Sequence, residues 1–206
     1  DEQAESVLLR NIDGKTLHSP RNFRFTAGRR DQAWNKNCIA VGLSSGFLEP
    51  LESTSIHMIM TAVTRILQLF PHGKINQSTV DEYNAQAESE FVRIRDFIIL
   101  HYHLNQRTDH PLWQYCREMA LPDALAQRLE LFRHSAQIFR QQDELFTEVA
   151  WQQVLLGQNL LPASYHPLAD SLTKAQLTGF FADLKQVVSK TVTALPSHQS
   201  FLQSQS

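Results

Sequence analysis

The sequence predicts a mainly α-helical fold with a few short strands, which is incomplete as a folding unit on its own. From Ser55 onward, apolar residues recur with the period of an α-helix over most of the chain. Before Ser55, only residues 22–29 and 37–42 show the patterns of short strands. Because two short strands make a poor sheet alone, we expect them to complete a sheet whose other strands lie outside this chain.

The first predicted helix begins at Ser55 and ends before Pro71. Its apolar residues keep a 3.6-residue period and predict one broad buried stripe: Ile56, Ile59, Met60, Val63, Ile66, Leu67 and Phe70. A long helix follows, in which Ser78 and Asp81 resemble a capping box. It should run to about Leu104 with one apolar face, made by Phe91, Ile94, Ile98 and Tyr102.

The remaining chain is also predicted to be helical. Pro111 and Pro122 suit the first turns of two helices, and residues 171–195 form the last long one, stopped by Pro196. The polar tail from 197 to 206 should fray. The sequence begins without an initiator Met, so we expect a fragment or a processed chain.

Composition places the chain in the ordinary globular class and excludes several functions. The 206 residues are 42% hydrophobic and 19% charged. Their net charge of -2 gives no positive electrostatic field that would attract nucleic acid. Cys38 and Cys116 fit neither a disulfide framework nor a zinc site, so a reducing cytoplasm is expected. No apolar stretch reaches the length of a membrane span, and the acidic N-terminus is unlike a signal peptide.

The segment from Trp34 to Phe70 has the organisation of a functional site. A strand leads into a Gly/Ser loop and then a helix, and Glu52-Ser53-Thr54-Ser55 precede the first turn. Such a helix start directs free backbone N–H groups at one point, which suits an anion or an electron-rich ring. Gly42 and Gly46 allow a flat group to approach the backbone. The alternative is that the Ser and Thr residues are plain N-caps and Glu52 is a surface carboxylate.

This segment resembles the second flavin-contacting loop of the flavin-dependent tryptophan halogenase family. The similar string is NCIAVGLSSGFLEPLESTSIH. Further similarity covers nearly the whole chain: GRR and W.KN before the loop, then DFIILHYHLNQRTDHPLW, W..V..GQ and LPSHQSFL. The resemblance implies the helical, substrate-side part of an α+β flavin monooxygenase-like fold. It divides the chain into residues 1–56, which complete an absent FAD domain, and residues 57–206, which form the helical substrate-binding part.

The resemblance also implies a reaction, its cofactors and its partners. Family members use FADH2, O2 and a chloride or bromide ion to make hypohalous acid, which halogenates an electron-rich aromatic such as an indole. A separate flavin reductase supplies the FADH2. No metal, nucleic acid or membrane is involved, and a homodimer stays open.

Residue roles carry over by position. Glu52 corresponds to the active-site glutamate, which stabilises the arenium intermediate and accepts its proton. The other expected roles are flavin contact for Leu43, Gly46 and Ile56, halide binding by the backbone N–H groups of Thr54 and Ser55, and substrate contact for Glu52 and Trp151. Some members have glycine where this chain has Ser55, a change that keeps the backbone donor.

The family's flavin half is not represented in this sequence. No GxGxxG fingerprint occurs, and none of the six lysines resembles the catalytic one: Lys15, Lys36, Lys74, Lys174, Lys185 and Lys190. We therefore expect this polypeptide alone to bind flavin weakly and not to halogenate.

The clamp that grips free tryptophan also departs from the family. Its Tyr-Tyr pair, acidic residue and Phe-Trp pair fall near His134-Ser135, Gln141 and Leu145-Phe146, with Glu144 or Glu148 as substitutes if the register shifts. This favours a different indole or another electron-rich aromatic.

Two other functions and one other site stay open from the residues. A related flavin monooxygenase would hydroxylate without halide, and a non-catalytic helical interaction module would have no flavin domain. His57, His101 and His103 suggest a metal, but His101 and His103 point to different sides of a helix, so ordinary core or surface histidines are expected.

Overall fold

The computed structural model describes residues 2–141 and 144–205. Its contacts divide the chain into two units, and each is described by itself. The first unit comprises residues 1–102 and 141–146, and the second comprises residues 103–140 and 147–206. The predicted boundary between residues 56 and 57 concerns an FAD domain outside the chain and stays a prediction.

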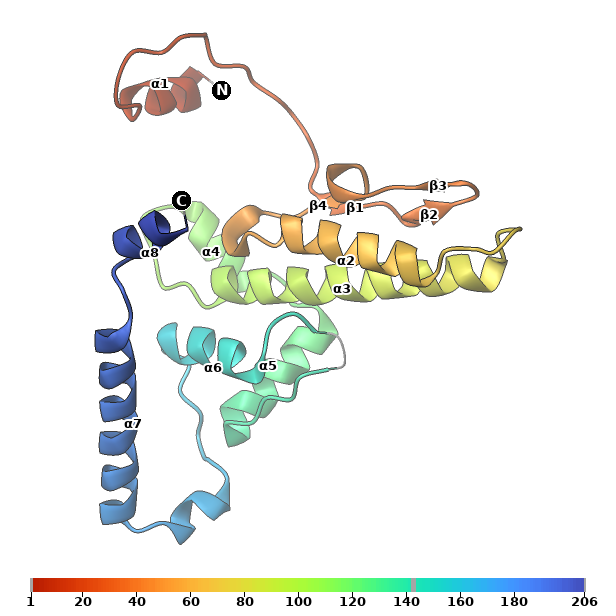
Figure 1. Ribbon diagram of the computed structural model, residues 1–206. Coiled ribbons are helices and arrows are strands. Elements are labelled where there is room, and N and C mark those ends of the chain that lie inside the picture. The colour runs from red at the N-terminus through yellow and green to blue at the C-terminus, as the bar shows by residue number, and fades with distance from the viewer. Residues whose placement is uncertain (1, 142–143, 206) are drawn as a thin grey trace. The chain divides into compact units, whose positions relative to one another are not determined.

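The described chain is mainly helical with four very short strands (Figure 1), so the predicted fold class is confirmed. The helices are α1 Glu2–Arg10, α2 Ser55–Gln68, α3 Gln77–His103, α4 Pro111–Glu118, α5 Asp123–Ser135, α6 Glu148–Gly157, α7 Lys174–Ala194 and α8 His198–Ser204. Short 3-10 turns occupy Gly42–Ser44, Pro50–Glu52 and Pro167–Ser171. No helix in the described ranges is both long enough and apolar enough to cross a membrane.

The strands form two separate antiparallel pairs. β1 (Gly28–Arg29) pairs with β4 (Gly46–Phe47), and β2 (Trp34–Asn35) pairs with β3 (Cys38–Ile39). Of the predicted strand at 22–29, only the last two residues pair as a strand. Residues 22–27 are exposed and pair with no strand within the described chain.

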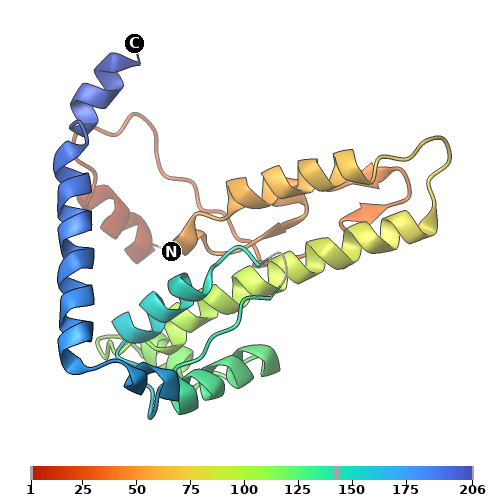
Figure 2. The same ribbon diagram turned by 60° about the horizontal axis from the view of Figure 1, so that its bottom comes forward.

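The first unit has its core between α3 and the elements that cover it. In Figures 1 and 2, α2 runs alongside α3 and the strands lie near the same pair of helices. One core cluster contains Trp34, Val80 and Tyr83, and a second contains Leu48, Ile94 and Ile98. Phe91 and Tyr102 pack against the second cluster, so the predicted apolar face of α3 is confirmed.

The predicted burial of the α2 stripe is wrong for this chain. Ile56, Met60 and Leu67 are 73%, 62% and 72% exposed, and only Ile66 of the stripe is half-buried. The face of α2 that is buried instead carries Ala62 and Arg65. The apolar period of α2 was correctly identified, but the described chain has no surface that covers this apolar face.

Two helix ends also differ from the prediction. The cap of α3 is Asn76, whose Oδ1 accepts a hydrogen bond from the Ser78 N–H at 3.0 Å, and Asp81 instead accepts one from the Gln77 side chain. The C-terminal tail does not fray at once, because Ser197 Oγ accepts from the Ser200 N–H at 3.1 Å and begins α8. Both corrections come from a polar side chain directly ahead of the helix.

The second unit has its core on α5 and α6. The side chains of Leu125, Leu129, Phe132, Trp151 and Leu155 are almost completely buried. The guanidinium of Arg128 lies 4.2 Å from the centre of the Trp151 ring, so α5 covers this part of α6. Pro111 lies in the first turn of α4 as predicted, whereas Pro122 lies one residue earlier than predicted, at the N-cap of α5.

Candidate functional site

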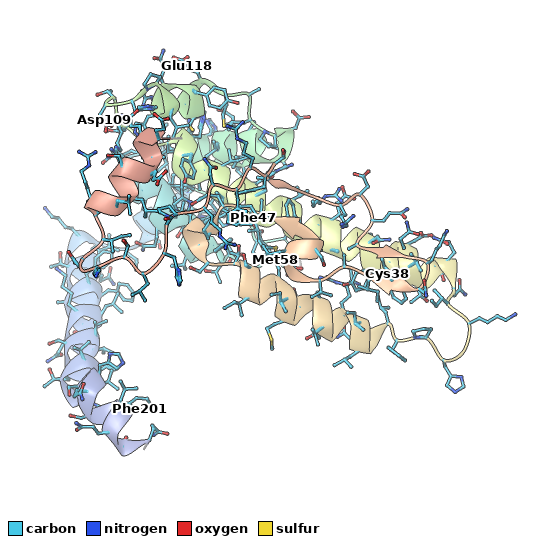
Figure 3. All side chains as sticks on the ribbon, turned by 90° about the horizontal axis from the view of Figure 1, so that it is seen from above. Cys38, Phe47, Met58, Asp109, Glu118 and Phe201 are labelled. Atoms are coloured by element: carbon cyan, nitrogen blue, oxygen red, sulfur yellow. The ribbon has the colours of Figure 1, made fainter. Side chains whose placement is uncertain are left out.

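The loop between Gly42 and Ser55 is built from two 3-10 turns on either side of β4. Gly42 has a φ of 65°, and the N–H of Ser45 donates to its carbonyl at 2.9 Å. β4 then pairs with β1, and Leu48 is buried in the core below. Figure 3 labels Phe47, which lies on β4 within this loop, and Met58, which lies in the first turns of α2 beyond it. The loop is therefore held by the core at Leu48 and by the sheet at β4.

Ser53 holds the chain in a left-handed turn directly after Glu52. Its φ and ψ are 53° and 33°, and its N–H donates to the Pro50 carbonyl at 2.9 Å. A non-glycine residue in this region costs free energy and is common at functional sites. The turn fixes the backbone of Glu52 before α2 begins.

The N-terminus of α2 is suited to an anion. Thr54 is the cap residue and is 3% exposed, but within the described residues its side chain makes no capping hydrogen bond. The first N–H groups of a helix have no partner inside the helix, and the helix dipole adds positive potential there. A halide at this position would accept hydrogen bonds from the backbone N–H groups of Ser55 and its neighbours, which have no partner inside the helix.

Glu52 faces a histidine from α3. Its Oε1 lies 3.0 Å from Nε2 of His101, with side chains that are 32% and 17% exposed. The other ring nitrogen of His101, Nδ1, lies 2.8 Å from the backbone carbonyl of Phe97. The carboxylate is thus half-buried and anchored, and it is not a loose surface group.

The expected flavin-contacting residues lie at open positions. Leu43 and Ile56 are 76% and 73% exposed, while Gly46 is half-buried. A Cβ on Gly46 would stand 2.9 Å from the Gly28 carbonyl oxygen and 2.9 Å from Cε2 of Phe91, so a side chain does not fit there. Gly46 therefore has a packing role inside the chain whatever it contacts outside it. The flavin roles of the three residues stay predictions.

Leu43 and Gly46 line one cavity of about 670 Å³. Its other walls come from residues 25–30 and from residues 44, 45 and 47. Phe25 packs edge-on against Phe47 with ring centres 5.0 Å apart, and the side chain of Arg30 donates to the Ser44 carbonyl at 2.5 Å. Arg29 also borders the cavity and pairs with Glu88. Apolar rings, two glycines and two arginines therefore line this cavity.

A polar cluster lies between α2 and α3. Glu90 accepts a hydrogen bond from Thr61 Oγ1 at 2.7 Å and from Arg65 at 3.0 Å, and it lies 3.3 Å from Nε2 of His57. Arg65 is 8% exposed and stands over the ring of Tyr83. Burial raises the pKa of the Tyr83 phenol, and the neighbouring Arg65 opposes that rise. The cluster places His57, in the first turn of α2, on the α3 side.

Trp151 lies in the second unit and is 1% exposed, with the Arg128 guanidinium over its ring. Its expected contact with substrate stays a prediction. The positions expected for the tryptophan clamp are engaged otherwise. The Phe146 ring stacks on Phe97 at 3.7 Å between centres, and Ser135 Oγ donates to the Leu131 carbonyl at 2.9 Å.

Sequence reasoning missed the partner of Glu52. It treated His101 as an ordinary core or surface histidine and identified no carboxylate near it. The described residues contain no group of three or more His, Cys, Asp or Glu that would hold a metal ion. His103, on another side of α3, points Nδ1 at the Cys116 carbonyl at 3.3 Å.

Comparison with known proteins decides the family. The sequence profile of tryptophan halogenases matches residues 1–174. The chain belongs to the tryptophan halogenase family. Among the relatives of this halogenase-family chain are tryptophan 6-halogenase ThaL of Streptomyces albogriseolus, 31% identical over 87% of the chain, and tryptophan 7-halogenase RebH of Lentzea aerocolonigenes, 30% identical over 88%. The matches cover 37% and 38% of those two proteins.

Solved structures give the same family with higher similarity. Xcc4156, a flavin-dependent halogenase from Xanthomonas campestris, is 46% identical, with a TM-score of 0.91 over 98% of this chain and 41% of its own. BrvH, a flavin-dependent halogenase from Brevundimonas sp. BAL3, is 42% identical, with a TM-score of 0.90 over 99% and 42%. This halogenase-family chain thus spans about two fifths of the proteins that it matches.

Proposed function

We propose that this chain acts as the C-terminal, substrate-side part of a flavin-dependent halogenase, which uses FADH2, O2 and chloride or bromide to halogenate an electron-rich aromatic. The observation that carries the proposal is Glu52. By the resemblance, this carboxylate would correspond to the family's active-site glutamate. It is anchored by His101 and precedes a helix start whose first N–H groups have no partner inside the helix and could bind a halide.

The flavin would be held mainly by residues outside this chain. Reduced flavin with O2 supplies the oxidising power that converts halide into hypohalous acid. The residues here would contribute one side of the cavity at Leu43 and Gly46, and the exposed side chain of Ile56. The apolar stripe of α2 would be covered by the flavin-binding part of a longer protein, because large exposed apolar faces are typical of interfaces. A separate flavin reductase would provide FADH2.

The chemistry assigned to Glu52 is general-base catalysis. When the electrophilic halogen adds to the ring, the resulting arenium ion is positively charged and must lose a proton. A nearby carboxylate stabilises that charge and accepts the proton, which restores aromaticity. Thr54 and Ser55 would present backbone N–H groups to the halide at the start of α2.

The substrate we propose is an indole or similar ring other than free tryptophan. Near the expected clamp, Phe146 is stacked on Phe97 and packs against the core cluster of Leu48, Ile94 and Ile98. Neither residue at 145 and 146 reproduces the Phe-Trp pair of the clamp, and an ammonium group would lack the expected carboxylate at Gln141.

Mass spectrometry of products tests the proposal. The longer protein would be supplied with a flavin reductase, FAD, bromide and a panel that includes indole and free tryptophan. We expect brominated indole, slower reaction with tryptophan, and a loss of about 100-fold or more in Glu52→Gln, the scale of general-base catalysis. Glu49→Gln, an exposed carboxylate of the same loop, should retain the wild-type rate.

Two other outcomes would replace the proposal. A hydroxylated product that forms equally without bromide would show the flavin monooxygenase. A folded, flavin-loaded protein that changes no member of the panel would favour the non-catalytic interaction module. The 206-residue chain assayed alone should form no product; turnover by it would contradict the assignment of the flavin site to residues outside it.

A further inference from the structure

His101 has one ring nitrogen whose protonation is fixed by its surroundings. Nδ1 lies 2.8 Å from the carbonyl oxygen of Phe97, four residues earlier in α3. A carbonyl oxygen only accepts hydrogen bonds, so Nδ1 must carry the hydrogen. The ring is also held by packing, because it stands edge-on to the buried Phe97 ring with centres 4.9 Å apart. Its orientation toward Glu52 is therefore set from two sides.

The second ring nitrogen shares a proton with Glu52. Nε2 lies 3.0 Å from Oε1 of the carboxylate. With Nδ1 protonated, Nε2 is either a lone pair or an N–H donor, and a lone pair facing an ionised carboxylate at this distance would be repulsive. One proton must lie between the two atoms, whether it is bonded to the nitrogen or to the oxygen. The pair as a whole is then electrically neutral in either form.

This arrangement leaves the other carboxylate oxygen for a substrate. Among the described residues, Oε2 of Glu52 makes no hydrogen bond, and the side chain is 32% exposed. The backbone of Glu52 is held by the left-handed turn at Ser53, and Oε1 is held by His101. The free oxygen consequently has a defined direction, which a carboxylate on a loop would otherwise lack.

We propose that His101 is the positioning residue for Glu52, and that the shared proton holds Oε1 so that Oε2 receives the proton lost by the arenium ion. This rests on the proposed function. In the step, the ring C–H bond breaks, its electron pair returns to the aromatic system, and an O–H bond forms at Oε2. The pair then holds two protons, as a carboxylic acid beside an imidazolium. It returns to its resting state when one proton leaves to solvent through the exposed edge of the two side chains.

Kinetics of His101 variants in the longer protein test the proposal. His101→Phe keeps a ring against Phe97 but removes both nitrogens. We expect turnover to fall roughly 10- to 100-fold with the KM for indole unchanged, because orientation of a base affects the proton-transfer step. His101→Gln places an amide donor near the position of Nε2 and should recover part of that loss. His103→Phe, which changes a histidine on another side of the same helix, is the matched control and should leave turnover unchanged.

An isotope effect separates positioning from a general loss of structure. Indole deuterated at the carbon that becomes halogenated should react like ordinary indole in the wild type, if proton loss is fast there. In His101→Phe, proton loss should become slow, so the deuterated substrate should react measurably more slowly than the ordinary one. Equal rates for the two substrates in His101→Phe would overturn the proposal.

Histidine NMR supplies a readout that does not depend on activity. In protein labelled with ¹⁵N-histidine, the signal absent from His101→Phe identifies His101, and it should show a protonated Nδ1 and a strongly hydrogen-bonded proton at Nε2. Glu52→Gln should change the Nε2 signal and leave Nδ1 protonated. An unprotonated Nδ1, or an Nε2 signal that ignores Glu52→Gln, would overturn the proposal. A wild type that does not halogenate would instead overturn the proposed function, whereas halogenation at full rate by His101→Phe would overturn the role of His101 alone.

Discussion

Removal of the Arg65 side chain is the most informative perturbation of the first unit. Arg65 and Glu90 pair across α2 and α3 at 3.0 Å, with side chains that are only 10% and 13% exposed. Truncating one member of a buried ion pair leaves the other charge without compensation and costs about 3–5 kcal/mol. Here Glu90 keeps its hydrogen bond from Thr61 at 2.7 Å and the nearby His57. We therefore expect Arg65→Met to lower the free energy of unfolding by about 2–3 kcal/mol.

Urea and thermal unfolding of the chain, followed by circular dichroism, measure that cost. At roughly 2–4 °C for each kcal/mol in a protein of this size, the midpoint should fall by about 4–12 °C. The double variant Arg65→Met/Glu90→Leu removes both charges and should recover most of the loss, because an apolar pair fits a buried site at least as well. Arg133→Met is the control, since its pair with Glu130 is exposed and 3.9 Å long, and it should change stability by less than about 0.5 kcal/mol.

Two results would refute this reasoning. If Arg65→Met cost no more than Arg133→Met, the charge at Glu90 would be solvated and not buried. If the double variant were as unstable as the single one, packing and not charge would explain the loss. A second signal comes from Tyr83, whose pKa should rise further in Arg65→Met, because burial persists while the cation that opposes it is gone. Alkaline titration of tyrosine absorbance would detect this shift.

Two further predictions concern packing and exposure. Gly46→Ala should destabilise the chain by about 1–3 kcal/mol, since its Cβ would meet the Gly28 carbonyl oxygen and Phe91 at 2.9 Å. Gly179→Ala, inside α7, meets nothing within 4 Å and should stabilise the chain by up to about 1 kcal/mol. Urea unfolding compares the two variants. The double variant Met60→Glu/Leu67→Glu should reduce self-association of the chain in ultracentrifugation with little change in its stability, because both side chains are exposed. The same variant should destabilise a longer protein in which α2 is covered. Unchanged stability of the longer protein would show that the apolar stripe of α2 is open to solvent.

The helices from α2 to α7 and the inner face of α3 could be predicted from their apolar patterns and helix-end residues, whereas α1 and α8 were not predicted. The apolar positions of α3 repeat at helical spacing, and Leu48 and Phe146 supply the surface that they pack against. The stripe of α2 has an equally clear period, but periodicity shows only that a face is apolar. It does not show which molecule covers that face, so burial within the chain was the wrong conclusion.

The candidate site could be located from the loop sequence, but its chemistry could not be completed. Glu52 and the start of α2 are adjacent in sequence, and their arrangement follows from the strand–loop–helix pattern. His101 is distant in sequence and reaches Glu52 only because α2 lies alongside α3. One signal was present in the sequence: His101 follows Phe97 by one helical turn, so the two residues share a side of α3. That signal identifies a face of the helix and gives no information about what the face meets.

The same helix connects the buried ion pair to the catalytic proposal. Glu90 and His101 both lie on α3. Glu90 contacts Arg65 in the body of α2, and His101 contacts Glu52, three residues before α2 begins. A shift of α2 by one turn, about 5.4 Å, would break both contacts, so each fixes the register of α2 along α3. Buried ion pairs contribute little net stability, but in some proteins they discriminate between alternative packings. The Arg65→Met/Glu90→Leu variant separates these effects. If the pair acts mainly on register, this variant keeps its stability in the longer protein while halogenation falls and the Nε2 signal of His101 changes; full activity would show that His101 alone is sufficient to place Glu52.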